Sequence, residues 1–471
     1  MEKCFYRKVG YGLSITDKVP SDPLQWAQSQ VASVPTLHWT GTTYSTKDGI
    51  EFARKVRIVQ DKADKIKDNE KRWEIEKKGR LENGRWFHGA NEITIRHNEA
   101  INGENPVFER FSQFWCNHFA IVDKSMLPWF VTGPYHREVI RPALGGNFND
   151  LLYDATISWA MIENLDNDEN TGPNSKKAHE NYKAGINENH ARELMELHSI
   201  SPNAGYTQED VIQAAYIMSG WRHKWTEGRK KFNPVIYDGF AHQSGEKIVM
   251  GKTYKGGKKE LRAFTNDLAN HPACKKFIAT KLCRHFITEN PTDEMIQPII
   301  TAWTKSNGSL PFIHKAVIKV TYEYSGKEKK FSQVETWMEQ LARMYKFRWV
   351  PDPKHMVWNP KYKSFGDQRR VLKWLEKTGQ HPYKPKDVNG WSDFKTDWIS
   401  GEQLIRRLIF AKQVQSWGMK NQKEFHLQIL EKNFEQKDID AILSRVEFFS
   451  DGTLGSENFA LLVNSPEILY V

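Results

Sequence analysis

The sequence contains no run of about 18 apolar residues, so it predicts no helix that spans a membrane. Its opening stretch, "MEKCFYRKVGYGLS", also lacks the apolar segment of a secretory signal peptide. As it stands, the sequence predicts a cytoplasmic protein; the alternative is a periplasmic or exported protein whose leader has been removed. Cysteine is scarce, and the four that occur form no C-x-x-C pair: Cys4, Cys116, Cys274 and Cys283. This pattern disfavours a structural zinc site and predicts buried thiols in a reducing compartment.

Several catalytic motifs are also missing. There is no H-E-x-x-H or E-x-x-H pair for a metal, and no G-x-S-x-G to present a nucleophilic serine. The glycine-rich stretch 245–257 lacks the P-loop arrangement and opens no helix, so nucleotide binding has no support. The acidic stretch 165–172 lacks the glycine and the final glutamate of a calcium loop. No standard motif therefore names a reaction.

The composition is that of a large folded protein. The 471 residues include 39% hydrophobic side chains, with 25 Phe, 17 Trp and 16 Tyr, which excludes a disordered chain. The net charge of +10 would favour an acidic partner, but basic and acidic residues alternate. Residues 61–82 hold eight basic and seven acidic side chains, which predicts a solvent-exposed helix with i,i+4 ion pairs. Nucleic acid is therefore a disfavoured partner.

Helical periodicity dominates the chain, so we expect a mainly α fold with one large multi-helix body. Residues 207–210, "TQED", are typical of a capping box at a helix start. The predicted helices cover 61–82, 105–122, 148–165, 187–200, 208–219, 262–287, 293–306, 334–346, 402–418, 422–432 and 436–447. Strand signals are confined to 232–256, which predicts one or two β-hairpins. We expect a main body over 1–348 and a C-terminal helical part over 349–471, packed on that body.

Seven blocks of residues occur in an order that is familiar from one protein family. They are "FWCNHF" (114–119), "YHREVIRPALGGNFNDLL" (135–152), "INENHARELMELHSIS" (186–201), "GYTQEDV" (205–211), "HQSGEKIVMG" (242–251), "LANHPACKKFIATKLCRHFI" (268–287) and "PKDVNGW" (385–391). The series resembles the bacterial family catalogued as domain of unknown function 1800. The resemblance implies no particular activity. It does imply a companion protein of a sulfatase-like or phosphatase-like family as a partner.

The chain departs from the family pattern at three places. Cys116 stands where the pattern has histidine, and His190 stands where it has tyrosine. The block that begins at His242 lacks the acidic residue of the pattern. The departure at His190 weighs against it as a ligand, because tyrosine could not serve there in the same way. Cys116 could still bind a metal in place of histidine, but the helical period puts Cys116 and His118 on different sides of the predicted helix 105–122.

The segment 187–200 carries the densest set of ionisable groups. As a helix capped by Asn187, it places one polar set on one face: Asn189, Arg192, Glu193 and Glu196. Ala191, Leu194, Met195 and His198 lie on an apolar face. One interpretation is an ordinary amphipathic helix with an Arg192–Glu196 ion pair. The other is a helix that lines a site, with Glu193 as its functional carboxylate.

A metal centre is one form that such a site could take. His118, on the predicted helix 105–122, lies on the same side as aromatic residues, and His198 is a second inward imidazole. If the two helices pack together, His118, Glu193 and His198 would form a ligand set for Zn, Fe or Mn. The alternative for each histidine is a hydrogen-bonded residue of the core.

Two arginines suggest binding of an anion instead. Arg137 and Arg141 are four residues apart and, with Arg192, could hold a carboxylate, phosphate or sulfate of the substrate. The alternative is a buried network of these arginines with Glu138 that joins helices.

Three functions stay open at this point. The first is an enzyme, such as a metal-assisted hydrolase or oxidoreductase, with catalytic groups Glu193, His198 and Arg192 and substrate-binding groups Arg137 and Arg141. The second is a non-catalytic partner or assembly protein that acts with a companion. The third is a polyanion-binding protein.

Overall fold

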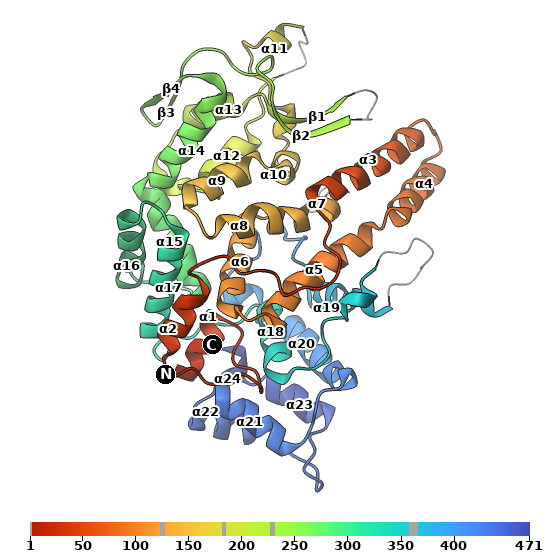
Figure 1. Cartoon of the computed structure of the whole chain (residues 1–471), viewed down its shortest axis with the longest axis vertical. Coiled ribbons are helices and arrows are strands. Elements are labelled where there is room, and N and C mark those ends of the chain that lie inside the picture. Colours follow the sequence, from red (N-terminus) through yellow and green to blue (C-terminus); the bar gives the residue numbers. More distant parts are fainter. Residues whose placement is uncertain (1, 123–127, 181–184, 227–230, 358–365) are drawn as a thin grey trace.

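The computed structural model describes residues 2–122, 128–180, 185–226, 231–357 and 366–471, and it is built almost entirely from helices. The strands form two antiparallel two-stranded sheets in the described part of the chain. Figure 1 shows them together at one end of an elongated body of helices. The predicted mainly α fold with a small β excursion is confirmed. No helix of the described residues is long and apolar enough to cross a membrane.

The first third of the chain contains a helical hairpin that projects from the body (Figure 1). The helices of this first part of the chain are α1 (Glu2–Val9), α2 (Pro23–Gln30), α3 (Thr46–Ala63), α4 (Asn69–Glu82), α5 (Arg85–Asn102) and α6 (Pro106–His118). The projecting hairpin consists of α3 and α4. The prediction of one helix over 61–82 is wrong, because α3 ends at Ala63 and the chain turns back into α4. The Asp68 carboxylate accepts hydrogen bonds from the main-chain N–H groups of Glu70 and Lys71, which fixes the new helix start.

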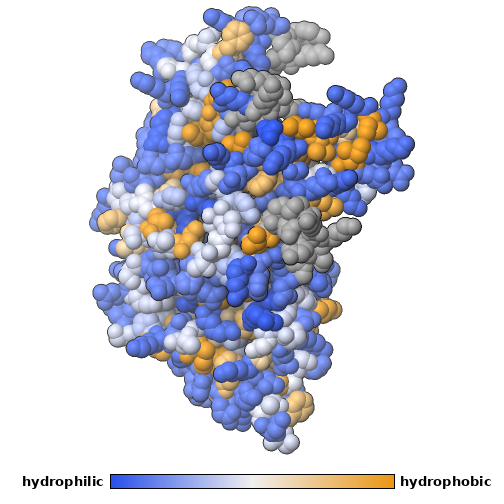
Figure 2. All heavy atoms as spheres, turned by 45° about the vertical axis from the view of Figure 1, so that its right-hand side comes forward, coloured by the Kyte–Doolittle hydropathy of each residue, from blue (hydrophilic) through white to orange (hydrophobic). Residues whose placement is uncertain are grey.

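The surface of this α3–α4 hairpin is mixed in character. Figure 2 shows hydrophobic residues between hydrophilic ones on the projecting arm. Ile75 and Leu81 of α4 are exposed, while Gly79 lies against Val59 of α3. The charged residues cover the outer surface, and the two helices pack through small and β-branched side chains.

The middle of the chain holds short helices and one π-helical segment. Its helices are α7 (Pro128–Tyr135), the π-helix His136–Ile140, α8 (Arg141–Ala143), α9 (Phe148–Ile157), α10 (Trp159–Asn164), α11 (Lys176–Glu180), α12 (Asn189–Glu196) and α13 (Gln208–Met218). The predicted helix 148–165 is interrupted because Ser158 is extended and caps α10. The predicted capping box at Thr207 and Asp210 is present at the start of α13.

The β excursion consists of two hairpins. Strands β1 (Trp221–Thr226) and β2 (Lys231–Tyr237) pair with Trp221 opposite Tyr237. Strands β3 (Lys247–Val249) and β4 (Lys252–Tyr254) form the second hairpin. The excursion therefore begins earlier than the predicted residue 232, since the first strand follows directly after Gly220 at the end of α13.

Of the remaining helices, α14 to α17 lie along one long side of the body, and the later ones form its lower half (Figure 1). They are α14 (Glu260–Asn270), α15 (Pro272–Phe286), α16 (Asp293–Lys305), α17 (Leu310–Tyr324), α18 (Val334–Tyr345), α19 (Arg370–Thr378), α20 (Gly401–Val414), α21 (Lys423–Asn433), α22 (Gln436–Leu443), α23 (Ser456–Val463) and α24 (Pro466–Leu469). The predicted helix 262–287 is two helices, because His271 is extended and caps α15 in front of Pro272.

The buried apolar side chains form two main clusters. The residues of the first cluster come from the part of the sequence between Phe5 and Val320. The second cluster is built mainly from residues 331–469, with Ala90, Ile93 and Ile101 of α5. Helix α18 thus belongs with the C-terminal cluster, although the predicted division at residue 348 assigns it to the first part. That division stays a prediction. The chain ends tie the parts together, since Arg7 of α1 donates a hydrogen bond to the main-chain oxygen of Tyr470.

Helix α6 runs through the centre of the body, and every one of its residues except Asn117 is buried. Residues three and four apart share a helix face. One face carries Glu109, Ser112, Gln113 and Cys116, and another carries Phe114, Asn117 and His118. The two faces border two different cavities, which are the candidate sites of the molecule.

Candidate functional site

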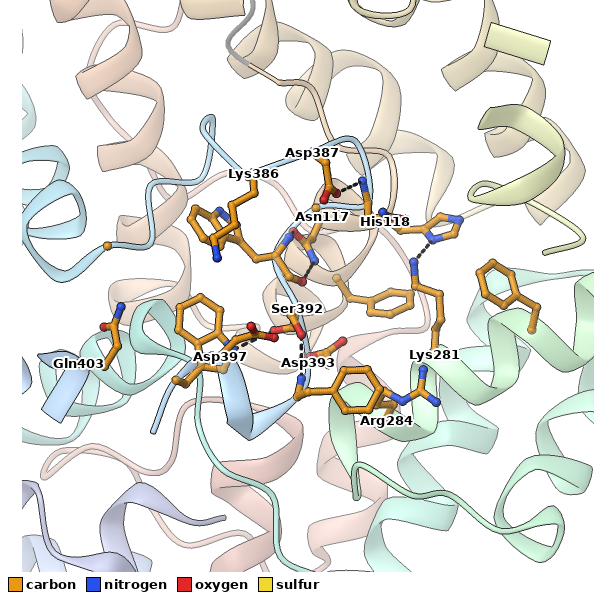
Figure 3. A pocket seen from close by; sticks show the side chains of 18 residues that line it. Asn117, His118, Lys281, Arg284, Lys386, Asp387, Ser392, Asp393, Asp397 and Gln403 are labelled. Atoms are coloured by element: carbon orange, nitrogen blue, oxygen red, sulfur yellow. Dashed lines mark hydrogen bonds between the residues drawn. The ribbon is translucent and has the colours of Figure 1, made fainter. Parts of the chain in front are cut away.

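An open pocket of about 440 Å³ lies between α6, α15 and the loop that joins α19 to α20 (Figure 3). Its lining combines positive charge, carboxylates, amides and aromatic rings. The lining includes Asn117, His118, Phe277, Lys281, Arg284, Lys386, Gly390, Trp391, Asp393 and Phe394. A pocket of this size and mixture is typical of a site for a small molecule.

Asn117 of α6 fixes the loop that forms one wall of the pocket. Its side-chain Nδ2 donates to the main-chain oxygen of Trp391 (2.8 Å), and its Oδ1 accepts from the Trp391 N–H (2.7 Å). Gly390 has φ +77°, and a Cβ at this position would lie 2.4 Å from the main-chain oxygen of Asn117. Only glycine allows this approach, so "NGW" at 389–391 is the sequence that lets the loop dock on α6.

Lys281 of α15 reaches across the pocket to His118, as Figure 3 shows. The Lys281 Nζ lies 3.0 Å from His118 Nδ1, and His118 Nε2 lies 3.2 Å from the main-chain oxygen of His198. A carbonyl oxygen only accepts a hydrogen bond, so Nε2 carries the ring proton and donates a hydrogen bond to the main-chain oxygen of His198. The Nδ1 lone pair therefore accepts a hydrogen bond from the Lys281 ammonium.

Burial lowers the pKa values of Lys281 and His118 and so favours the neutral form of each side chain. Burial lowers the pKa of Lys281 to about 8; Asp393 opposes this shift, while Arg284 adds to it. Burial, together with the positive charge of Lys281, lowers the pKa of His118 well below its usual value. A lysine that titrates near neutrality beside an imidazole is an arrangement suited to proton transfer.

Among the described residues the positive groups of the pocket make no direct ion pair, although Asp387, Asp393 and Asp397 line the same pocket. These groups are Lys281, Arg284 and Lys386. The Nε of Arg284 donates to the main-chain oxygen of Glu289 (3.2 Å), and its guanidinium lies 4.8 Å from the centre of the Phe394 ring. These cations are available to an anionic ligand.

Asp393 is the one carboxylate that is tied firmly into the pocket wall. Its Oδ1 accepts from His285 Nδ1 (2.8 Å) and from Gln333 Nε2 (2.9 Å), and Lys330 donates to its main-chain oxygen. Burial acts to raise the pKa of Asp393, but His285 and Lys330 outweigh burial and bring the pKa below its usual value. Asp393 therefore remains a charged part of the scaffold.

The second cavity is a small polar chamber of about 50 Å³ on the other side of α6. Its borders are α5, α6 and the π-helix His136–Ile140, and each of its arginines is paired with a carboxylate. Arg137 lies 2.8 Å from Glu92, and Arg141 lies 2.6 Å from Glu109. Burial raises the pKa of Glu109 to about 7, although Arg141 acts to lower it. Buried pairs of this kind neutralise each other and join the helices.

The predicted arginine network forms only in part. Arg137 and Arg141 line the chamber, but Glu138 accepts hydrogen bonds from Thr46 outside it. Arg192 lies far along the chain on α12 and pairs with Glu188 (2.9 Å) and Glu196 (3.4 Å) at the surface. The predicted Arg192–Glu196 ion pair is therefore present, but Arg192 contributes nothing to the chamber.

The predicted metal set is not assembled. His118 and His198 lie together, with ring centres 6.1 Å apart. Glu193 is half-buried on the other face of α12, where it adds to the effects of burial and Glu196 that raise the pKa of Tyr206. The reason is geometric: Glu193 and His198 are five positions apart, whereas residues three or four apart share a helix face, and His198 lies outside the helix. Helix α12 also ends at Glu196, short of the predicted residue 200.

Another group has the spacing of a metal site. Across the part of the chain that the structure describes, only His97, Glu335 and Glu339 bring three ligand atoms within 4.8 Å of one another. However, the indole N–H of Trp349 donates to His97 Nδ1 (3.0 Å). The ring proton must then lie on Nε2, so neither ring nitrogen offers a lone pair to a cation. Arg96 also holds Glu335 through a contact of 2.9 Å, which makes the group a structural ion cluster.

The sequence-based interpretation missed Lys281, Arg284 and the loop around Trp391. Lys281 has the appearance of an ordinary basic residue on an amphipathic helix, and its partner His118 is 163 positions away. The only signal was that the blocks 268–287 and 385–391 belong to the series that carries the family resemblance.

The comparisons with known proteins assign a family and no activity. The model of the family described as "Protein of unknown function (DUF1800)" matches residues 5–470. The chain belongs to this family. No curated protein and no solved structure matches it. In this DUF1800 chain the blocks 114–119, 268–287 and 385–391 all meet at the open pocket, and the block 186–201 supports it through His198.

Proposed function

We propose that this protein is an enzyme that binds a small anionic substrate in the open pocket and transfers a proton through the Lys281–His118 pair. One observation carries the proposal: the ammonium of Lys281 is held by a neutral imidazole at 3.0 Å in an accessible pocket. A lysine that merely stabilised the fold would ordinarily be paired with a carboxylate or would lie in solvent.

The anionic character of the substrate follows from the unpaired cations. Arg284 and Lys386 line the same pocket as Lys281, and a guanidinium binds carboxylates and phosphates through two parallel hydrogen bonds. Trp391, Phe277 and Phe394 supply apolar walls, which strengthen such contacts by limiting water. The ligand that fits this lining has a negative group and an apolar portion.

The proposed proton transfer rests on the lowered pKa of Lys281 and on the tautomer of His118. Lys281, with a pKa of about 8, is an acid near neutral pH and becomes a base once it has lost its proton. His118 holds its Nδ1 lone pair toward Lys281, because Nε2–H is bound to the carbonyl of His198. His118 thus orients the ammonium and can accept a proton for a moment during the reaction.

Calorimetric titration with inorganic phosphate and with acetate tests the binding part. We expect Arg284→Gln to weaken binding of both anions about tenfold, or roughly 1.4 kcal/mol. Lys276→Gln is the matched control, because it removes one positive charge from the exposed side of the same helix α15. Equal binding by wild type and Arg284→Gln would contradict the proposal.

Turnover assays test the catalytic part. A panel of aryl esters of acetate, phosphate and sulfate provides anionic and neutral substrates with a coloured product. Lys281→Met should abolish turnover at any pH, while Lys276→Met should not change it. If Lys281→Met retains turnover, the proposed role of Lys281 is wrong. If the pocket binds anions but the wild type turns over none of these substrates, the non-catalytic alternative gains support.

The metal-assisted form of the enzyme and the companion protein of a sulfatase-like or phosphatase-like family stay as further proposals. No step above uses a metal, because the predicted ligands do not converge. The metal content of purified protein, measured by mass spectrometry, tests the first of these proposals, and co-purification with the companion tests the second.

A further inference from the structure

We infer that Lys281 is a nucleophile that forms an imine with the carbonyl carbon of an anionic carbonyl compound, such as a 2-oxo acid. This inference deepens the proposed function and rests on it, because it assigns a substrate class to the same pocket. It concerns the side-chain nitrogen itself, whereas acid–base catalysis alone would only require its proton.

The surroundings of Lys281 are those of an activated amine. The Nζ has one hydrogen-bond partner, the neutral His118, and it makes no ion pair with a described carboxylate; the charge of Asp393 acts on it only from beyond contact distance. It also lies 5.5 Å from the centre of the Phe277 ring, so one side of the amine is apolar. A neutral amine is the nucleophilic form, and both desolvation and a neighbouring cation favour it. The pKa of about 8, lowered by burial and by Arg284, agrees with this geometry.

The remaining groups of the pocket match the rest of the substrate. The terminal nitrogens of Arg284 make no hydrogen bond or ion pair with any residue that the structure describes, so they are available to a carboxylate. Lys386 provides a second positive charge on the opposite wall. A carboxylate beside the carbonyl group would place the reactive carbon near Lys281 while the acid group meets Arg284.

The reaction balances with the groups at hand. The nitrogen lone pair of neutral Lys281 attacks the carbonyl carbon, a C–N bond forms, and the carbonyl electron pair moves to oxygen. One N–H proton passes through Nδ1 of His118 to this oxygen, which gives a carbinolamine. The nitrogen lone pair then forms the C=N bond as the C–O bond breaks, and the leaving hydroxyl takes the second N–H proton, again through Nδ1 of His118, and departs as water. The products are the imine and one water molecule, and no oxidant or reductant is consumed.

Reductive trapping tests the inference on the full chain. Pyruvate and sodium cyanoborohydride are added to the protein, since this reagent reduces imines to stable amines, and the adduct is located by peptide mass spectrometry. We expect one dominant adduct on Lys281, with a rate that rises as pH passes through about 8. Acetone, which has a carbonyl but no charge, should label this residue at least tenfold more slowly.

Three variants give the test its controls. Lys281→Arg keeps the positive charge and should lose the adduct completely. Arg284→Gln should lower the labelling rate by pyruvate about tenfold and the rate with acetone much less, because with acetone only the rise in the Lys281 pKa acts. Lys276→Met, on the exposed side of α15, should label like the wild type. Circular dichroism of each variant establishes that it is folded.

The outcomes separate the two proposals. Equal labelling of Lys281 and surface lysines overturns the imine inference. If pyruvate binds saturably, with weaker binding in Arg284→Gln, yet no adduct forms, the proposed pocket stands and the imine inference falls. If neither pyruvate nor phosphate binds and Lys281 is not labelled, both fall.

Discussion

The open pocket and the buried chamber lie on two sides of the same helix, α6, and contain the same kinds of charged side chains. In the chamber each arginine has a carboxylate within 3 Å, as in Arg137–Glu92 and Arg141–Glu109. In the pocket Lys281, Arg284 and Lys386 face the cavity without an ion pair from the described residues. The residue types are therefore shared by the two regions, and the pairing of charges distinguishes them.

The difference teaches how to separate structural charges from functional ones. A charge that is sealed from water must be matched by an opposite charge, so a fully paired cluster explains itself through the fold. An unmatched cation that lines an accessible cavity of about 440 Å³ has no such structural explanation. The predicted substrate-binding residues Arg137 and Arg141 fall in the first class, and Arg284 falls in the second.

A fall in pH should have the largest effect on the stability of the protein, and it acts through buried histidines near the open pocket. Burial lowers the pKa of His190 and of His198 to about 3, and both lie behind the pocket. The unfolded side chains bind protons below about pH 6.5, so their contribution to stability is complete above that pH and is lost as pH falls toward 3. Protonation of each such histidine should reduce the free energy of unfolding by roughly 2 kcal/mol between pH 6.5 and 5, so that the two together reduce it by about 4 kcal/mol.

Urea unfolding at these two pH values measures the effect. His190→Leu removes one buried imidazole. It should therefore reduce the change in the free energy of unfolding between pH 6.5 and 5 by roughly 2 kcal/mol. His179→Leu changes an exposed histidine and should leave the slope as it is. An unchanged slope in His190→Leu would show that His190 is protonated or bound to a partner in the folded state.

Breaking a pair in the chamber should give the next largest effect. Arg141→Met leaves the buried Glu109 without its cation, and we expect a loss of about 3 kcal/mol in the free energy of unfolding. The double variant Arg141→Met with Glu109→Met should recover most of this loss, because no charge is then stranded. Arg284→Gln in the pocket should cost less than about 1 kcal/mol, and a loss equal to that of Arg141→Met would remove the distinction between the two regions.

The close contact between Gly390 and the main chain of α6 can be tested by comparing two glycine substitutions. Gly390→Ala should cost about 2 kcal/mol and weaken phosphate binding, since the added Cβ meets the Asn117 oxygen and pushes the loop off α6. Gly452 has the same φ of +77° but no atom within 4 Å of an added Cβ. Gly452→Ala should therefore cost only the backbone strain, about 1 kcal/mol, with phosphate binding unaffected.

The smallest effect is expected for the charged surface of the α3–α4 hairpin. Replacing Lys62, Lys65, Lys77 and Lys78 together with glutamine should change stability by a few tenths of a kcal/mol per ion pair and leave anion binding intact. The Lys78–Glu82 contact is exposed and 3.8 Å long. A loss of anion binding in this variant would place the functional surface outside the pocket.

The sequence by itself determined the local features of this protein. The 3.6-residue repeat predicts the helices because each amphipathic stripe must be buried, and the Thr207–Asp210 capping box fixes the start of α13 through contacts within three residues. The same periodicity placed Cys116 and His118 on different sides of α6, and they border different cavities. Breaks caused by a single extended residue, as at Ser158, were missed because the apolar pattern continues across them.

Only the tertiary structure decided which charged groups meet. Lys281 finds His118 across 163 positions, and Asn117 finds Trp391 across 274. Glu193, which the dense helix 187–200 suggested as the functional carboxylate, is turned away by the short length of α12 and the five-position offset from His198. Periodicity reports which face of a helix is buried, but the partner on the other side depends on how all the helices pack. The candidate site, unlike the helices around it, is therefore a property of the folded chain.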